Sequence, residues 1–128
     1  MNPPLKHIGI AFLGGALGSV ARLLVGETFD NLTTLIIVNL LGAAFLGYVN
    51  GSSKAGKRGF VSAGSKLFWG AGFAGGFTTM SGLAMGFVVL VANVTPALAA
   101  MYFLGQLFFG LICYGSAYRA GSGEWPNA

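Results

Sequence analysis

Four long runs of apolar residues, separated by short polar segments, divide the 128-residue chain. Each run predicts a transmembrane helix, because about 20 consecutive apolar residues cross a hydrocarbon core about 30 Å thick. The predicted spans cover residues 8–25, 32–49, 67–92 and 97–118. They are expected to form one transmembrane domain over residues 1–128. The pattern therefore predicts an all-α membrane protein of four helices.

The third predicted span is longer than one membrane crossing requires. As an unbroken helix, residues 67–92 would extend roughly 39 Å, against a hydrocarbon core of about 30 Å. Gly75 and Gly76, closely followed by Thr78 and Thr79, form the place where a break is expected. Glycine tolerates non-helical angles, and threonine hydroxyls can pair with backbone groups that a break releases. Such a break indicates a transport or ion site, although glycines that only let helices pack closely fit the spacing equally well.

Composition agrees with a membrane location. Hydrophobic residues make up 55% of the chain and charged residues 8%, which is more apolar surface than a water-exposed exterior of this size needs. Four short helices bury little against one another, so oligomerisation is expected. The single cysteine, Cys113, has no partner for an internal disulfide. The net charge of +4 does not predict nucleic-acid binding, because the basic residues flank apolar spans next to the lipid bilayer.

The basic residues are unevenly divided between the two membrane sides. With four spans, the N-terminus, the central loop and the C-terminus share one side, which carries six bases, against Arg22 alone on the other. The six are Lys6, Lys54, Lys57, Arg58, Lys66 and Arg119. The positive-inside rule places both termini in the cytoplasm. A chain with this fixed orientation does not readily pair with an inverted copy of itself, so an antiparallel assembly would need a second, oppositely oriented subunit.

Several kinds of chemistry are absent from the predicted spans. The three acids, Glu27, Asp30 and Glu124, all lie outside them, which argues against a proton-coupled multidrug exporter with a membrane carboxylate. Ser81 has no His or Lys in the spans that could act as its base, so the sequence does not predict an enzyme. The glycine-rich run is not followed by the lysine of a phosphate loop.

The polar residues that remain in the spans are neutral, apart from Arg22. They are Asn39, Thr78, Thr79, Ser81, Tyr102 and Gln106. Neutral donors with one cation near a mouth suit a small anion better than a metal cation, because N–H and O–H groups can replace the hydration shell of an anion. For Asn39, hydrogen bonding between helices is an alternative that the sequence leaves open.

Three stretches resemble the Fluc/CrcB fluoride channels. Residues 14–22 are similar to the first-helix pattern GGxxGxxxR of that family, and residues 38–47 to its second-helix pattern VNxxGxFxLG. Residues 72–83 resemble its third-helix box GfxGGxTTFSTF. Together with four spans of suitable length, the resemblance covers nearly the whole chain.

The resemblance implies a fluoride channel of the bacterial cell membrane that confers fluoride resistance by passive export. Members of the family are dual-topology or paired subunits that assemble as antiparallel dimers with two fluoride pathways. By resemblance, the pathway residues are Asn39, Thr79, Met80, Ser81, Leu83, Tyr102 and Gln106, with Arg22 near a vestibule. The third helix is implied to be broken, with the backbone carbonyls of Gly75 and Thr78 binding a structural Na⁺ on the dimer axis.

The chain departs from the family box at positions that would face the ion. Met80 and Leu83 replace two phenylalanines, and Gly82 replaces a threonine. Leu35 and Gln106 stand where small hydroxyl residues are expected. A phenylalanine offers an anion a positive ring edge, which methionine and leucine lack. Together with the charge bias, these losses favour one half of a heterodimer in which one pathway is degenerate; a conducting homodimer and a non-transporting accessory subunit remain as alternatives.

Overall fold

The computed structural model describes residues 3–127, and those residues form helices and connecting turns without any strand. The elements are α1 (Pro3–Thr28), α2 (Asn31–Lys54), α3 (Ala63–Ser65), the π-helix η1 (Lys66–Ala74), α4 (Gly75–Phe77), α5 (Met80–Asn93) and α6 (Pro96–Ser122). Four stretches are long and apolar enough to cross a membrane: Pro4–Thr28, Asn31–Lys54, Ala63–Asn93 and Pro96–Ser122. The expected all-α architecture with four membrane-spanning helices is confirmed.

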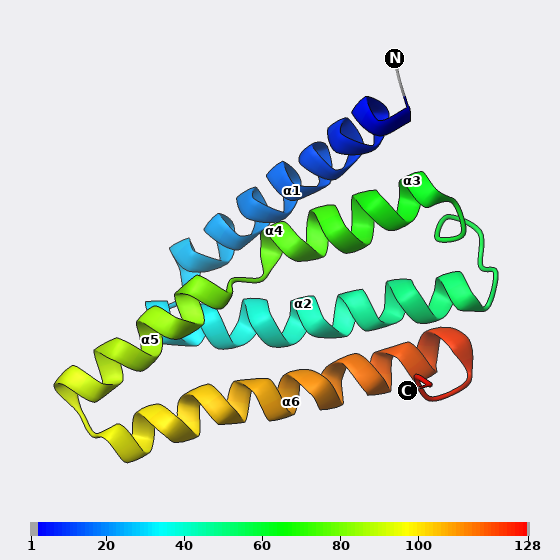
Figure 1. Cartoon of the computed structure of the whole chain (residues 1–128). Helices are drawn as coiled ribbons and strands as arrows, with labels where there is room; N and C mark the ends of the chain where they lie inside the picture. Colours follow the sequence, from blue (N-terminus) through cyan, green and yellow to red (C-terminus); the bar gives the residue numbers. More distant parts are fainter. Residues whose placement is uncertain (1–2, 128) are drawn as a thin grey trace.

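The four long stretches run alternately in opposite directions (Figure 1). α2 packs along α6, α1 packs along η1 and α4, and α5 packs against α6. Both ends of the described chain and the turn between α2 and α3 lie at the same end of the bundle, at the right in Figure 1. The turns that join α1 to α2 and α5 to α6 lie at the other end.

Local capping residues determine where two helices begin. The Asp30 carboxylate accepts a hydrogen bond from the Thr33 N–H (3.0 Å) at the start of α2. The Thr33 hydroxyl also donates to this carboxylate, and these bonds lower the pKa of Asp30. At the start of α6, Thr95 Oγ1 accepts from the Leu98 N–H (3.1 Å) and Pro96 is the first helical residue. Neutral or charged oxygens thus satisfy N–H groups that have no partner within the helix.

The helices continue beyond the apolar runs from which the spans were predicted. α2 ends at Lys54, so the first residues of the polar segment between the second and third spans are helical. α6 ends at Ser122, where Gly123 turns the chain with a φ of 83°. A hydropathy pattern ends where polar residues begin, whereas a helix ends where its backbone is capped.

Close packing of α1 on the third stretch depends on glycines. A Cβ atom at Gly14 would collide with the Phe68 carbonyl oxygen, and one at Gly76 would collide with the Gly15 carbonyl. Gly18 lies equally close to the backbone of η1. The Gly14/Gly18 and Gly72/Gly76 pairs therefore let the two backbones approach closely. Gly82 and Gly86 differ, because their neighbours are side chains rather than backbone.

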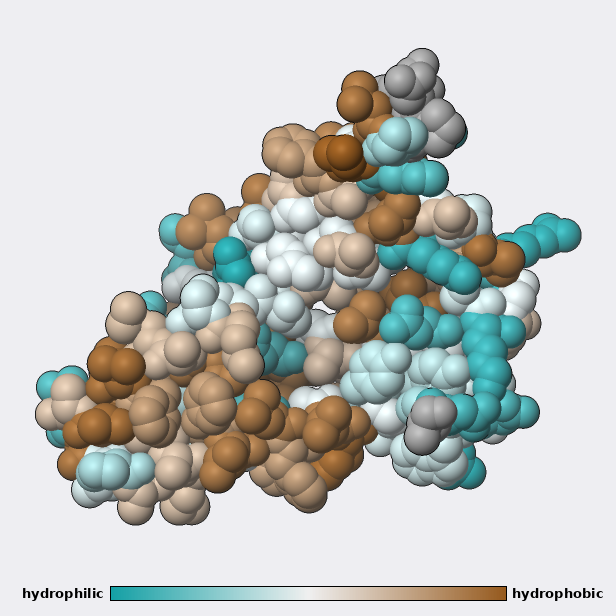
Figure 2. Space-filling view, in the orientation of Figure 1, coloured by the Kyte–Doolittle hydropathy of each residue, from teal (hydrophilic) through white to brown (hydrophobic). Residues whose placement is uncertain are grey.

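Large apolar side chains cover much of the surface. Figure 2 shows hydrophobic residues spread over α5 and α6, while hydrophilic residues gather at the end that holds the turn after α2. On α6, for example, Leu111 is 73% exposed and Met101 is 70% exposed. Few large side chains are fully buried, Val38 and Val49 among them. This surface suits contact with lipid or with a second apolar subunit rather than with water.

Candidate functional site

The third membrane-crossing stretch contains two extended residues near its middle. α4 ends at Phe77 and α5 begins at Met80. Thr78 has φ −82° and ψ 161°, and Thr79 has φ −150° and ψ 114°. The Thr79 hydroxyl accepts a hydrogen bond from the Gly82 N–H (3.0 Å) and so caps α5. The extended residues expose backbone groups that a continuous helix would pair internally.

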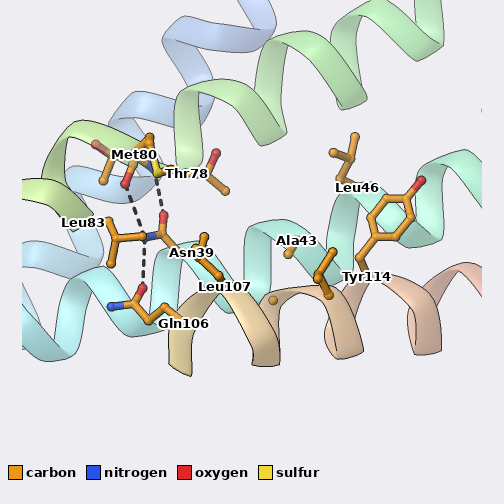
Figure 3. Close-up of a pocket in the computed structure, with 12 residues that line it drawn as sticks. Asn39, Ala43, Leu46, Thr78, Met80, Leu83, Gln106, Leu107 and Tyr114 are labelled. Atoms are coloured by element: carbon orange, nitrogen blue, oxygen red, sulfur yellow. Dashed lines mark hydrogen bonds between the residues drawn. The ribbon is translucent and has the colours of Figure 1, made fainter. Parts of the chain in front are cut away.

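Asn39 on α2 binds both backbone groups of Thr79. Its Oδ1 accepts a hydrogen bond from the Thr79 N–H (2.8 Å), and its Nδ2 donates to the Thr79 carbonyl (3.3 Å). Nδ2 also donates to Oε1 of Gln106 on α6 (3.1 Å). The dashed lines in Figure 3 mark this network. One amide therefore links α2, the extended residues and α6.

Arg22 on α1 reaches the same segment from the other side. Its Nη1 donates to the Thr78 carbonyl (3.0 Å), and Ser19 Oγ donates to the Gly76 carbonyl (3.4 Å). Arg22 and Ser19 line a cavity of about 510 Å³, together with Glu27 and other residues near the turn between α1 and α2. The lining of this cavity thus holds one positive charge, Arg22, and one negative charge, Glu27, and Arg22 connects it to the extended residues through its bond to Thr78.

A second cavity, of about 540 Å³, lies between α2, the extended residues and α6. Its lining includes six of the residues that the sequence singled out: Asn39, Thr78, Thr79, Met80, Leu83 and Gln106. The rest of its wall is apolar apart from Tyr114 (Figure 3). Apolar walls with a few amide and hydroxyl groups are typical of a binding or permeation site.

The other predicted site residues lie apart from this cavity. Tyr102 lines a smaller cavity of about 190 Å³, which it shares with Gln106. Ser81 is exposed on α5, and its Oγ lies 3.2 Å from Thr79 Oγ1. Of the two residues that replace phenylalanines, Met80 is 63% exposed and Leu83 only 3%. The predicted pathway residues are thus divided among three cavities and the exposed surface of α5.

Sequence reasoning missed two polar residues near the site. Tyr114 follows Gln106 and Gly110 at intervals of four, which places all three on one face of α6. Ser19 precedes Arg22 by three residues and shares its face of α1. In both cases the residue lies three or more positions from a predicted site residue on the same helix face, and this spacing could have identified it.

The residues implied to bind Na⁺ present oxygen ligands of a suitable kind. The Gly75 carbonyl lacks its α-helical donor, because the Thr79 N–H donates to Asn39 instead. A Cβ built at Gly75 would meet nothing within 4 Å, so the surface here is open. The Thr78 carbonyl accepts from Arg22 and keeps a second lone pair. Carbonyl oxygens suit hard cations, and the described residues hold no cluster of His, Cys, Asp or Glu that would suit another metal.

Comparison with known proteins extends over most of the chain. Residues 9–118 match the family described as CrcB-like protein, Camphor Resistance (CrcB). The fluoride-specific ion channel FluC 1 of Rhodococcus jostii is 35% identical over 104 residues, which cover 74% of this chain and 79% of that protein. The FluC channel of Chlorobium chlorochromatii is 35% identical over 111 residues, covering 83% of this chain and 84% of its own. The FluC channel of Thermosipho melanesiensis is 40% identical over 113 residues, which cover 83% of this chain and 87% of that protein.

No solved structure gives a significant match. The relatives are ion channels, which confirms the expectation that the chain is not an enzyme. The matched residues 9–118 contain the extended segment, Asn39, Arg22 and Gln106. The chain belongs to the CrcB family.

Proposed function

We propose that this chain is a subunit of a fluoride-selective channel that lets fluoride leave the cytoplasm by passive flow. The observation that carries the proposal is the Asn39 amide bound to both backbone groups of Thr79 in the wall of the 540 Å³ cavity. Relatives that share most of the chain are named fluoride-specific ion channels. Support thus comes from the membrane-depth polar site and from the family together.

The mechanism requires no chemical reaction. Hydrogen fluoride that enters the cytoplasm dissociates, and the anion is then trapped unless a channel lets it leave down its electrochemical gradient. Arg22, which bonds to the Thr78 carbonyl, would attract anions into the 510 Å³ cavity, against the opposing charge of Glu27 in the same lining. Amide and hydroxyl donors then replace water around the ion, and release stays easy because the lining of the 540 Å³ cavity holds no charged residue.

We further propose that the working unit is an antiparallel heterodimer in the bacterial cell membrane, with both termini of this chain in the cytoplasm. The six-to-one division of basic residues supports a single orientation for this chain. Met80 and Leu83 leave the site without aromatic edges, which a partner subunit would supply. One of the two pathways would then be intact and the other degenerate.

A structural Na⁺ on the dimer axis belongs to the same proposal. The carbonyls of Gly75 and Thr78 would hold it, and two oxygens are too few to fill its coordination shell. The equivalent carbonyls of the inverted subunit would complete the shell. Bound there, the ion would offset the negative ends of the carbonyl dipoles and hold the two extended segments together.

Co-expression tests the proposal. The chain is purified alone and with a homologous four-span subunit of opposite charge bias, and fluoride efflux from liposomes is followed with a fluoride electrode. The pair is expected to conduct fluoride and the chain alone to conduct little. Comparable efflux from the chain alone would support a homodimer instead, and no efflux from either preparation would overturn the channel function.

Asn39→Asp in the pair separates a pathway role from a scaffolding role. A carboxylate at this position cannot donate to the Thr79 carbonyl or to Gln106, and its negative charge in the cavity wall repels fluoride, so efflux is expected to fall. Asn50→Asp is the matched control, because Asn50 is exposed and, among the described residues, its side-chain amide bonds only to the Tyr114 hydroxyl (3.1 Å). An unchanged rate for Asn39→Asp would favour an accessory subunit.

A further inference from the structure

The chain after α6 folds back along the helix. Gly123 has a φ of 83°, and its N–H donates to the Arg119 carbonyl (2.7 Å), which turns the chain at the end of α6. The Ser122 hydroxyl accepts a hydrogen bond from the Glu124 N–H (3.1 Å), and the Glu124 carboxylate pairs with Lys54 of α2 (2.9 Å). Figure 1 shows the C-terminal end beside α6 rather than beyond it. This C-terminal segment therefore has a defined place next to the helix.

Trp125 of the C-terminal segment lies against the outer surface of α6. A Cβ built at Gly115 would come within 3.4 Å of the Trp125 ring. The Arg119 guanidinium lies over the same ring, with its Cζ 5.0 Å from the ring centroid. The Trp125 side chain is still 55% exposed. A tryptophan beside an arginine is typical of the boundary between the hydrocarbon core and the lipid headgroups, where one end of each side chain is apolar and the other polar.

A groove of about 390 Å³ lies between the C-terminal segment and α6. Apart from one serine and the indole N–H, its described lining is apolar. The floor and one side of the groove are formed by Phe108, Leu111, Ile112 and Gly115 of α6 together with Trp125 and Pro126. An apolar groove on a surface that faces the bilayer suits a hydrocarbon chain.

Arg119 places a positive charge beside this groove. It is exposed, and within the described part of the chain it forms no ion pair. A guanidinium stacked on an aromatic face keeps N–H groups along its edge, and these can donate to two oxygens of one phosphate. The same end of the bundle carries six bases and one acid, Glu124, which Lys54 already pairs. This excess of positive charge attracts a headgroup of net negative charge more than a zwitterionic headgroup, which also carries a cation.

We propose that this groove is a binding site for an anionic phospholipid. One acyl chain lies on the apolar floor between α6 and Trp125, and the headgroup phosphate accepts hydrogen bonds from Arg119. The ion pair between Lys54 and Glu124 holds the C-terminal segment in place, so that Trp125 forms the outer wall of the site. The site goes beyond the proposed fluoride function and does not depend on it.

The fluorescence of Trp125 reports on the occupant of the groove. Trp69→Phe leaves Trp125 as the only tryptophan and keeps an aromatic ring at position 69. The full-length chain with this change is reconstituted in phosphatidylcholine vesicles that contain a small fixed fraction of lipid with brominated acyl chains, which quench a tryptophan on contact. The brominated lipid is phosphatidylglycerol in one series and phosphatidylcholine in the other. Phosphatidylglycerol is expected to quench Trp125 more strongly, and the ratio of the two measures the headgroup preference.

Three further substitutions locate the site. Arg119→Gln is expected to lower the preference for phosphatidylglycerol about fivefold, since one base near an anionic headgroup contributes a factor of about five. Arg58→Gln is the matched control, because it removes the same charge from the same end of the bundle but Arg58 does not line the groove. It should retain the preference. Gly115→Leu leaves every charge in place and fills the floor beneath Trp125, so it should also lower the preference.

Equal losses of preference for Arg119→Gln and Arg58→Gln would assign the attraction to the basic end as a whole and overturn the site. Equal quenching by the two brominated lipids in the Trp69→Phe chain would overturn it too, as would an undiminished preference in Gly115→Leu, because the groove then holds no acyl chain. Melting temperatures in detergent verify that each variant is folded. Arg119→Gln and Gly115→Leu act on different parts of the site, so either one that folds is decisive. Fluoride efflux is not the readout, so the result is independent of the channel function.

Discussion

The Thr79 N–H and the Thr79 carbonyl are both bonded to Asn39, at 2.8 Å and 3.3 Å. Asn39→Leu would keep the branching and the number of heavy atoms of the side chain but leave both groups without this partner. A buried polar group without a partner costs about 1–3 kcal/mol, so a clear fall in melting temperature is expected in detergent. Asn50→Leu, at an exposed site, should change the melting temperature little. Equal effects at both positions would show that Asn39 does not hold the extended segment.

Gly14 and Gly9 of α1 offer a matched pair of substitutions. A Cβ at Gly14 would collide with the Phe68 carbonyl, whereas a Cβ at Gly9 would meet nothing within 4 Å. Gly14→Ala is therefore expected to destabilise the protein, because neither backbone can move aside easily. Gly9→Ala should be neutral or stabilising, since alanine favours a helix over glycine by up to about 1 kcal/mol. Thermal unfolding of both variants checks the order, and equal melting temperatures would contradict it.

Arg22 contributes a charge and a hydrogen bond to the Thr78 carbonyl (3.0 Å). Arg22→Gln removes the charge, and Arg22→Lys keeps it. If the charge concentrates anions, Arg22→Gln slows efflux more at low ionic strength than at high, because salt screens the field. Arg22→Lys should retain most of the wild-type rate at low ionic strength. Equal slowing of Arg22→Gln at both salt concentrations would assign Arg22 a purely structural role.

Orientation in the membrane is testable through the basic end of the bundle. The bases to be neutralised with glutamine are Lys54, Lys57, Arg58 and Lys66. The variant keeps two bases on that side against Arg22 on the other, so a mixture of orientations is expected. A reporter fused to the C-terminus measures the fraction on each side. Arg119→Gln alone should keep a single orientation, and an unmixed result for the fourfold variant would contradict the charge argument.

Met80 and Leu83 should respond differently to phenylalanine. Met80 is 63% exposed, so Met80→Phe finds open space and the melting temperature should hardly change. Leu83 is 3% exposed, so Leu83→Phe overpacks its surroundings at a cost of about 1–3 kcal/mol. Thermal unfolding distinguishes the two. A stable Leu83→Phe would show that the α5 contacts can adapt to an aromatic ring.

The Lys54–Glu124 ion pair (2.9 Å) joins the end of α2 to the chain after α6. Lys54 donates to Glu124 and lowers its pKa. This partner lies 70 residues away in the sequence, and the positive-inside count treats Lys54 only as a charge on one side. A count of charges on each membrane side therefore does not predict which charged residues form an ion pair.

What the sequence determined by itself is local. Apolar runs placed the four spans, Thr95 and Pro96 begin α6 through local capping, and the four-residue spacing of Gly14 and Gly18 puts both on one face of α1. Each of these depends on residues within a few turns of one helix, where the 3.6-residue period fixes which side chains share a face.

Only the tertiary structure decided which polar groups meet. Asn39 bonds to Gln106 across 67 positions and to Thr79 across 40, and Arg22 bonds to Thr78 across 56. Whether such distant residues meet depends on how each helix is rotated about its axis and on how closely the glycines let neighbouring helices pack. The sequence of a single span does not determine either. For the same reason the sequence could name Asn39 and Gln106 as polar residues in apolar spans, but it could not tell that both Nδ2 protons of Asn39 bond to other groups of the protein.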